Sequence, residues 1–145
     1  MNKPQRKQRN AGAAVEAALC LPLILLIISA TIELTTLIYL KESLTIAAYE
    51  GARLAVTRHA TDESVRERVA RVLTERHIDM TGYPLSEAVV ITPPTRDALL
   101  MEPVEVSVTG PTLGNTVSPI GLMRFISPPD MTAAVVMRKE FTSAE

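Results

Sequence analysis

The sequence predicts an α+β fold in which one long N-terminal α-helix carries a shorter second helix and a small antiparallel sheet of three strands. Three observations predict this fold. Residues 12–32 carry a single charge, and an apolar helical pattern continues beyond them to about residue 57. A charged segment with apolar residues at helical spacing follows at 63–77. After Gly82, short β-branched runs alternate with proline and glycine, a pattern typical of strands joined by turns.

The composition indicates a thin aliphatic domain. Of 145 residues, 47% are hydrophobic, but only 3% are aromatic and there is no tryptophan. The first nine residues hold four basic groups and no acid, so the remainder has 11 basic and 16 acidic groups, a net charge of −5. This acidic balance argues against a nucleic-acid-binding surface.

The N-terminal third is expected to anchor the chain in a membrane. Residues 1–11 form a basic leader that we expect to stay in the cytoplasm, because positive flanks are retained inside, and we expect residues 1–10 of it to be disordered. Residues 12–33 are expected to form a transmembrane helix, since the 21 residues 12–32 span ~30 Å, about the thickness of the hydrocarbon core. A signal peptide is disfavoured, because its small residues would follow the apolar run rather than precede it.

Four residues of this span carry specific expectations. Glu16 lies in a segment where a carboxylate costs roughly 2.5–3.5 kcal/mol at the bilayer centre, so it either sits at headgroup depth or pairs with a cation. Pro22 removes a backbone donor, which predicts a kink or local melting. Glu33 is expected at the far interface, either solvated or used in assembly. Cys20 is the single cysteine, so no intramolecular disulfide can form.

The helix is expected to continue through residues 34–57, where apolar residues recur at three- and four-residue steps. Small residues gather on this continuation and let another backbone approach closely: Ala47, Ala48, Gly51, Ala52 and Ala55. The helix at 63–77 can be capped by Thr61 or Asp62. Its predicted buried face consists of Val65, Val69, Val72 and Leu73.

Strands are expected near 88–92, 104–109 and 133–141, and the second of these alternates apolar and polar residues cleanly. The three strands would pack as an antiparallel sheet on the amphipathic helices. The long loop between Gly110 and Asp130 is rich in apolar residues. It either contacts a partner or the membrane face, or it folds over the sheet as core.

The sequence contains no pattern that indicates catalysis. His59 and His77 lie eighteen residues apart without acidic or cysteine partners at ligand spacing, so no metal site is expected. There is no phosphate-binding glycine loop and no G-x-S-x-G motif. We therefore expect a protein that is not an enzyme and needs no cofactor.

Three stretches together resemble a known family. The first is the small-residue segment ending Ala13-Ala-Val-Glu16, followed by Leu19-Cys-Leu-Pro-Leu23 and Ile32-Glu33. The second is Ala47-Ala-Tyr-Glu-Gly-Ala-Arg-Leu-Ala-Val56, close to an A-A-x-E-G-A-R signature, and the third is the terminal strand Ala133 to Glu140. This combination resembles the TadE-like pseudopilins of the tight-adherence (Tad) branch of type IV pilus systems.

The resemblance implies a pilin-like N-terminal helix and processing by a prepilin peptidase, a membrane aspartic protease that faces the cytoplasm. The predicted processing site comprises Ala11, Gly12 and Ala13. A cut between Ala11 and Gly12 makes Glu16 the fifth mature residue, and a cut after Gly12 makes it the fourth. The sequence departs from the family pattern at two positions, since glycine normally precedes the cut and a large residue, not Ala17, normally follows the glutamate.

The resemblance further implies a minor pseudopilin of the bacterial inner membrane, with a cytoplasmic N-terminus and a periplasmic domain that later joins an extracellular pilus. Its role would be pilus initiation, assembly and adhesion, with Glu16 holding axial register and Ala47, Gly51, Ala52 and Ala55 in helix packing. The implied partners are the prepilin peptidase, other pilins and pseudopilins, the assembly platform and membrane lipid. The alternative is an uncleaved, single-pass membrane scaffold or periplasmic interaction module.

Overall fold

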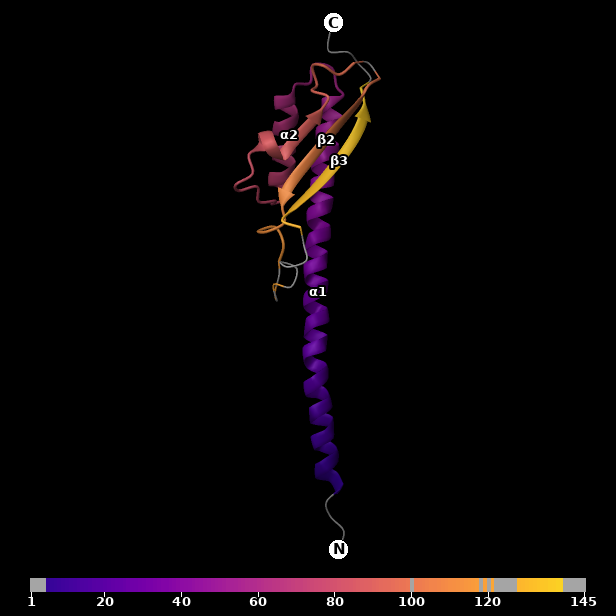
Figure 1. The fold of residues 1–145 in the computed structure, drawn as a ribbon, viewed down its shortest axis with the longest axis vertical. Helices are drawn as coiled ribbons and strands as arrows, with labels where there is room; N and C mark the ends of the chain where they lie inside the picture. The colour runs from indigo at the N-terminus through magenta and orange to yellow at the C-terminus, as the bar shows by residue number, and fades with distance from the viewer. Residues whose placement is uncertain (1–4, 100, 118, 120, 122–127, 140–145) are drawn as a thin grey trace.

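The computed structural model describes residues 5–99, 101–117, 119, 121 and 128–139, with side chains from residue 12 onward. It confirms the α+β architecture, a long helix that carries a small domain at its C-terminal end (Figure 1). The elements follow in the order α1 (Gln5–Ala55), α2 (Asp62–Glu75), α3 (Leu85–Ala88), β1 (Val89–Thr92), β2 (Pro103–Pro111) and β3 (Asp130–Arg138).

Helix α1 is longer and more continuous than the sequence predicts. It begins at Gln5, so the expected disorder of the leader is wrong for residues 5–10. Glutamine, arginine and lysine have high helix propensity, which explains this extension. The expected local melting at Pro22 is also wrong, since the helix continues through this residue to Ala55. Proline removes one backbone hydrogen bond, and the bonds on either side are sufficient to maintain the helix.

Helix α2 begins with a reciprocal cap. The Thr61 hydroxyl accepts a hydrogen bond from the Ser64 backbone N–H at 3.2 Å, and the Thr61 N–H donates to the Ser64 hydroxyl at 3.1 Å. Thr61 is therefore the N-cap, one of the two residues predicted for this role. The predicted buried face is confirmed and consists of Val65, Val69, Val72 and Leu73.

The three strands form one antiparallel sheet in the order β1-β2-β3. In the register, Val108 of β2 lies between Val89 of β1 and Ala133 of β3. Alternate residues of β2 point into the core, as the sequence pattern predicts. The outer strands differ in detail from the expectation: β3 begins at Asp130 and ends at Arg138, and the short helix α3 precedes β1.

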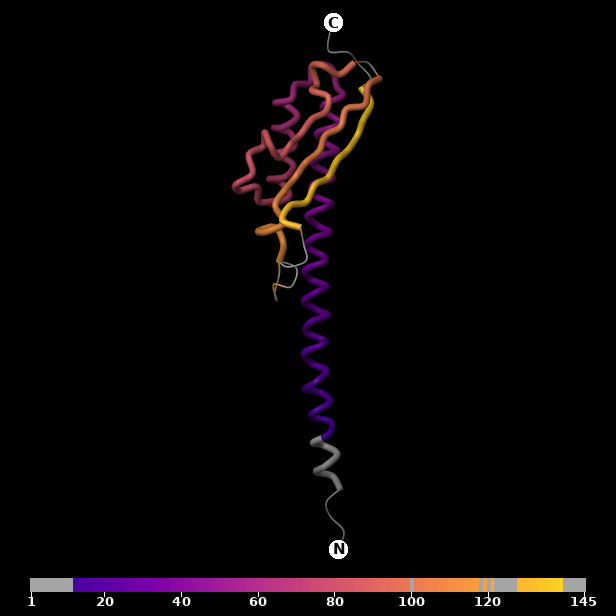
Figure 2. The backbone as a smooth tube through the Cα atoms, in the orientation of Figure 1, coloured from indigo at the N-terminus to yellow at the C-terminus, as the bar shows by residue number. Residues whose placement is uncertain are grey.

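The core lies between the sheet, α2 and the C-terminal part of α1, and the rest of α1 projects away from it (Figure 2). Gly51 of α1 is at the closest approach. A Cβ atom at this position would lie 2.8 Å from Cγ2 of Val69 in α2 and 3.2 Å from Cγ1 of Val106 in β2. Glycine thus allows both elements to pack on the same turn of α1.

A buried polar network closes the end of the domain that is farthest from the projecting helix. Lys139 is 1% exposed and its Nζ donates to the Thr95 carbonyl at 2.7 Å. The Thr95 N–H and hydroxyl donate to the Asp62 carboxylate at 2.8 and 2.6 Å. The loop around Thr95 therefore connects the start of α2 to the end of β3.

Candidate membrane and assembly surface

The N-terminal half of α1 exposes nearly all its large apolar side chains. Leu19 is 73% exposed and Ile27 is 56% exposed, and every residue from 12 to 28 is exposed. Burying one such side chain contributes roughly 1.5–3 kcal/mol, so this surface requires non-aqueous surroundings. Among the described residues, Gly12–Ala55 is the helix that is long and apolar enough to cross a membrane.

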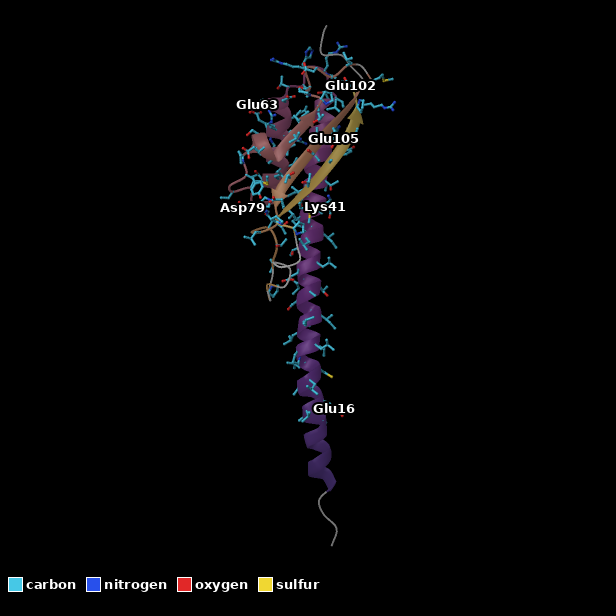
Figure 3. All side chains as sticks on the ribbon, viewed as in Figure 1. Glu16, Lys41, Glu63, Asp79, Glu102 and Glu105 are labelled. Carbon is cyan, nitrogen blue, oxygen red and sulfur yellow. The ribbon has the colours of Figure 1, made fainter. Side chains whose placement is uncertain are left out.

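The predicted processing and register residues lie on this projecting rod. Gly12, Ala13 and Glu16 are exposed, and a Cβ at Gly12 would meet nothing within 4 Å. Figure 3 places Glu16 far from the folded domain. Ala11 belongs to α1 by its backbone, but its side chain lies outside the described residues. The roles of these residues in processing and register stay predictions.

The predicted helix-packing residues lie together in the domain core. Ala47, Ala52 and Ala55 are fully buried, and Gly51 is buried beside them. This small-residue surface packs against α2 and β2 of the same chain, as the contacts at Gly51 show. In this structure they are therefore inaccessible to a helix from another chain.

Glu50 connects α1 to α2, a role that the sequence alone does not reveal. Arg68 Nη2 lies 2.7 Å from Glu50 Oε2, and Arg53 Nη1 lies 3.9 Å from Glu50 Oε1. The hydrogen bond with Glu50, followed by the charge of Glu50, raises the pKa of Arg68 above its ordinary value. The acid of the A-A-x-E-G-A-R motif thus has a stabilising role inside the domain.

Glu33 differs from the expectation of a solvated interfacial carboxylate. Glu33 is only 2% exposed, like the residues of the core, although it lies next to the exposed half of α1. Ser29 and Ala30, one turn earlier, are half-buried. The solvated alternative is therefore wrong, because the Glu33 side chain is buried in the folded chain.

The described start of the loop that follows β2, residues 112–117, has a hydrogen-bonded base and two exposed apolar residues. The Asn115 side-chain amide donates to the carbonyls of Asp79 and Pro111 at 2.8 and 2.9 Å, and its oxygen accepts from the Asp79 N–H at 2.7 Å. Leu113 is 69% exposed and Val117 is 59% exposed. These two residues are not core, and the remaining large apolar residues of the loop lie outside the described residues: Ile120, Leu122, Met123, Phe125 and Ile126.

The comparison with protein families agrees with the first stretch of the resemblance and with the second as far as Arg53. Residues 12–53 match the sequence model of the TadE-like protein family. This segment of the chain is TadE-like. No curated protein and no solved structure matches the chain.

The TadE-like segment comprises two parts with opposite surroundings. It includes the exposed apolar half of α1 together with the buried motif that ends at Arg53. The match shows that this segment is similar to the TadE-like family, and the apolar helix is compatible with a single-pass membrane anchor. The terminal strand, the third stretch of the resemblance, lies outside the matched residues.

A crevice of about 450 Å³ lies on α2 and the turn after it. Its walls include Leu73, Ile78, Asp79 and Tyr83. Hydrogen bonds donated by the Thr81 hydroxyl and backbone N–H hold the pKa of Asp79 below its usual value. A hydrogen bond to Asp130 raises the pKa of the Tyr83 phenol. These polar groups therefore fasten the turn to the domain.

The two histidines occupy turns rather than a shared site. His59 follows α1 and has a φ of 65°, and His77 follows α2 and has a φ of 55°. Both are exposed. Within the described ranges, His, Cys, Asp and Glu side chains form no group of three that could hold a metal ion.

Proposed function

We propose that this chain is a minor pseudopilin of a Tad pilus, held in the inner membrane by α1, cut by a prepilin peptidase and then added to a pilus. The observation that carries the proposal is the exposed apolar rod of residues 12–32 within the TadE-like segment. Lipid can surround this rod first, and equivalent rods of other subunits can surround it afterwards. The role is structural and uses no cofactor.

The charge distribution along α1 supports cleavage. The uncut helix has no acid in its first turn, and its N-terminal turns carry Arg6, Lys7 and Arg9. Positive charge is unfavourable there, because the helix dipole places partial positive charge at the same end. A cut after Ala11 removes the basic leader and leaves Glu16 close to the new terminus, where a carboxylate is stabilised.

The exposure of Glu16 supports a role in register. The carboxylate forms no hydrogen bond or ion pair with the described side chains, and it lies on an apolar rod. The new α-amino group of a neighbouring subunit offers the cation that such a carboxylate requires in apolar surroundings. One pair per subunit would then fix the axial position of each rod.

The experiment compares Glu16→Ala with Glu42→Ala, a matched change at an exposed acid of the same helix. Intact mass spectrometry is applied to membranes and to sheared surface material. We expect both variants to insert and to be cut at residue 11 or 12, and Glu16→Ala alone to be absent from the sheared material. Normal assembly of Glu16→Ala would overturn the register role, and a chain that keeps Met1 in both fractions would overturn processing.

The second candidate is an uncleaved single-pass scaffold. It is favoured by Ala11 and Ala17, which stand where the family pattern has glycine and a large residue. Docking of a partner helix at Gly51 does not support it, because Gly51 is buried within the domain. The same mass measurement separates it from the first candidate.

A further inference from the structure

The loop after β2 continues toward the apolar half of α1. Val106 of β2 lies opposite Gly51 of α1: a Cβ placed on Gly51 would lie 3.2 Å from Cγ1 of Val106. Gly110 lies opposite Leu44 in the same way, and a Cβ placed on Gly110 would lie 3.1 Å from Cδ2 of Leu44. Strand β2 therefore runs antiparallel to α1. In the view of Figure 1, residues 111–117 continue from the end of β2 in the direction of the N-terminus of α1.

The described start of the loop lies on the side of the domain that faces the expected membrane span. Glu33, the last residue of that span, lies ~16 Å along the helix from Leu44, at 1.5 Å per residue. Leu113, three residues beyond Gly110, can descend at most ~10 Å of that distance, and Val117 can descend farther. Residues 113–117 therefore lie beyond the level of Leu44, toward the level where the hydrocarbon core is expected to end.

Residues 112–116 are held in place by hydrogen bonds to one another and to the domain. The Thr112 N–H donates to the Pro129 carbonyl at 2.9 Å, and the Thr116 hydroxyl donates to the Thr112 carbonyl at 3.0 Å. Asn115 adds the three bonds to Asp79 and Pro111 described above. Leu113 and Val117 are therefore directed outward by a rigid base, and their exposure is not a consequence of a loose chain.

Three charged groups at this end of the domain are engaged with the domain itself: Lys41, Asp79 and Asp130. Asp79 accepts from the Thr81 N–H at 2.9 Å, and Asp130 accepts from the Tyr83 hydroxyl. Lys41 donates to the Thr132 carbonyl. Figure 3 shows Asp79 and Lys41 at the end of the domain nearest the projecting rod. Their hydrogen bonds lower the cost of bringing this end close to lipid.

We propose that residues 112–117 form a second membrane contact, in which Leu113 and Val117 enter the boundary between headgroups and acyl chains of the outer leaflet. The occupant of this surface is lipid, because the surface is continuous with the membrane-spanning rod. Side chains of this kind at that depth gain burial without dehydrating the polar backbone of the loop base. The inference rests on the proposed membrane anchoring, and it fixes the height and tilt of the domain above the bilayer.

The test uses the full chain with Cys20→Ala and one new cysteine at a time, labelled with an environment-sensitive fluorophore. The tested positions are Leu113→Cys and Val117→Cys. Ile32→Cys, 42% exposed at the outer end of the span, is the positive control. Leu99→Cys is the matched negative control, since Leu99 is 70% exposed and its N–H donates to Glu102, at the opposite end of the domain (Figure 3).

The labelled chains are reconstituted in vesicles of phosphatidylethanolamine and phosphatidylglycerol that carry a nitroxide near the top of the acyl chain. We expect loss of fluorescence at residues 113, 117 and 32, and none at residue 99. Quenching at 32 alone overturns the second contact and leaves membrane anchoring intact. Absence of quenching at 32 overturns both. Leu113→Cys could instead form cross-links between subunits of sheared filaments and show no quenching in vesicles. This result would assign residues 112–117 to a contact between subunits and overturn the lipid contact.

Discussion

The two halves of α1 differ in the pattern of their apolar residues and have opposite surroundings. From residue 12 to 28 every side chain is exposed, whereas Leu40, Leu44, Ala48 and Ala52 are fully buried. The C-terminal half has one apolar stripe and polar residues on its other faces, which suits a helix at the side of a small core. The N-terminal half is apolar on all sides, so no single domain of this size could cover it. One half of the helix is therefore already packed against the domain, and the other half requires a membrane or a filament.

The strongest prediction contrasts one leucine from each half. Leu44→Ala removes a fully buried side chain, and we expect it to lower the free energy of unfolding of the domain by about 2–5 kcal/mol. Leu25→Ala, at a site that is 53% exposed, should leave that free energy unchanged. Pulse proteolysis in urea, on the full chain in detergent micelles, measures both. Equal destabilisation by the two variants would contradict the division of α1 into two environments.

A second contrast uses the two glycines of α1. Gly51→Ala places a Cβ 2.8 Å from Val69, and we expect overpacking to destabilise the domain by about 1–3 kcal/mol. Gly12→Ala meets nothing within 4 Å and should not change the stability of the domain. The same proteolysis assay applies. A Gly51→Ala variant as stable as the parent would show that the close approach of α2 and β2 is not required.

A smaller effect is expected at the ion pair between α1 and α2. Glu50→Gln weakens the contact with Arg68, and we expect a loss of about 0.5–1 kcal/mol, because both side chains are partly exposed, at 22% and 39%. Glu42→Gln, at an exposed acid of the same helix, is the control and should have no effect. High salt should reduce the difference between the two variants. A difference that is unaffected by salt would indicate packing rather than charge.

The smallest expected effect is the contribution of Asp79 to the loss of stability at low pH. Because the pKa of Asp79 is lowered in the folded chain, the unfolded chain binds more protons, and stability rises with pH in this range. The contribution is complete above the ordinary aspartate pKa of about 3.9 and is lost as the pH falls through the lower, folded value. Asp79→Asn should remove part of the acid sensitivity between about pH 5 and about pH 2, measured by urea midpoints. An unchanged pH profile would show that the turn at Asp79 does not contribute.

Local signals in the sequence predicted much of the fold. The alternation of β2, the cap at Thr61 and the buried valines of α2 depend on neighbouring residues, and the structure confirms them. The exposed rod follows from a run of uncharged residues whose length matches a bilayer.

The features that the sequence did not predict depend on residues far apart in the chain. Glu50 and Arg68 are 18 residues apart on different helices, and their pairing follows from the crossing of α1 and α2. The burial of Glu33 and the anchoring of Asn115 on Asp79, 36 residues away, likewise require the tertiary fold. The close packing predicted around Gly51 occurs within one chain, because α2 and β2 return to it.

The single cysteine offers the most direct test of the division of α1. Cys20 is exposed on the apolar half, and Thr57 is exposed just after the buried half. In native membrane vesicles of both orientations, a membrane-impermeant maleimide should react with Thr57→Cys in a Cys20→Ala background. It should leave Cys20 of the parent chain unmodified until detergent is added, because lipid excludes the reagent. Reaction of Cys20 as fast as Thr57→Cys in intact vesicles would place residues 12–32 in water and contradict the account.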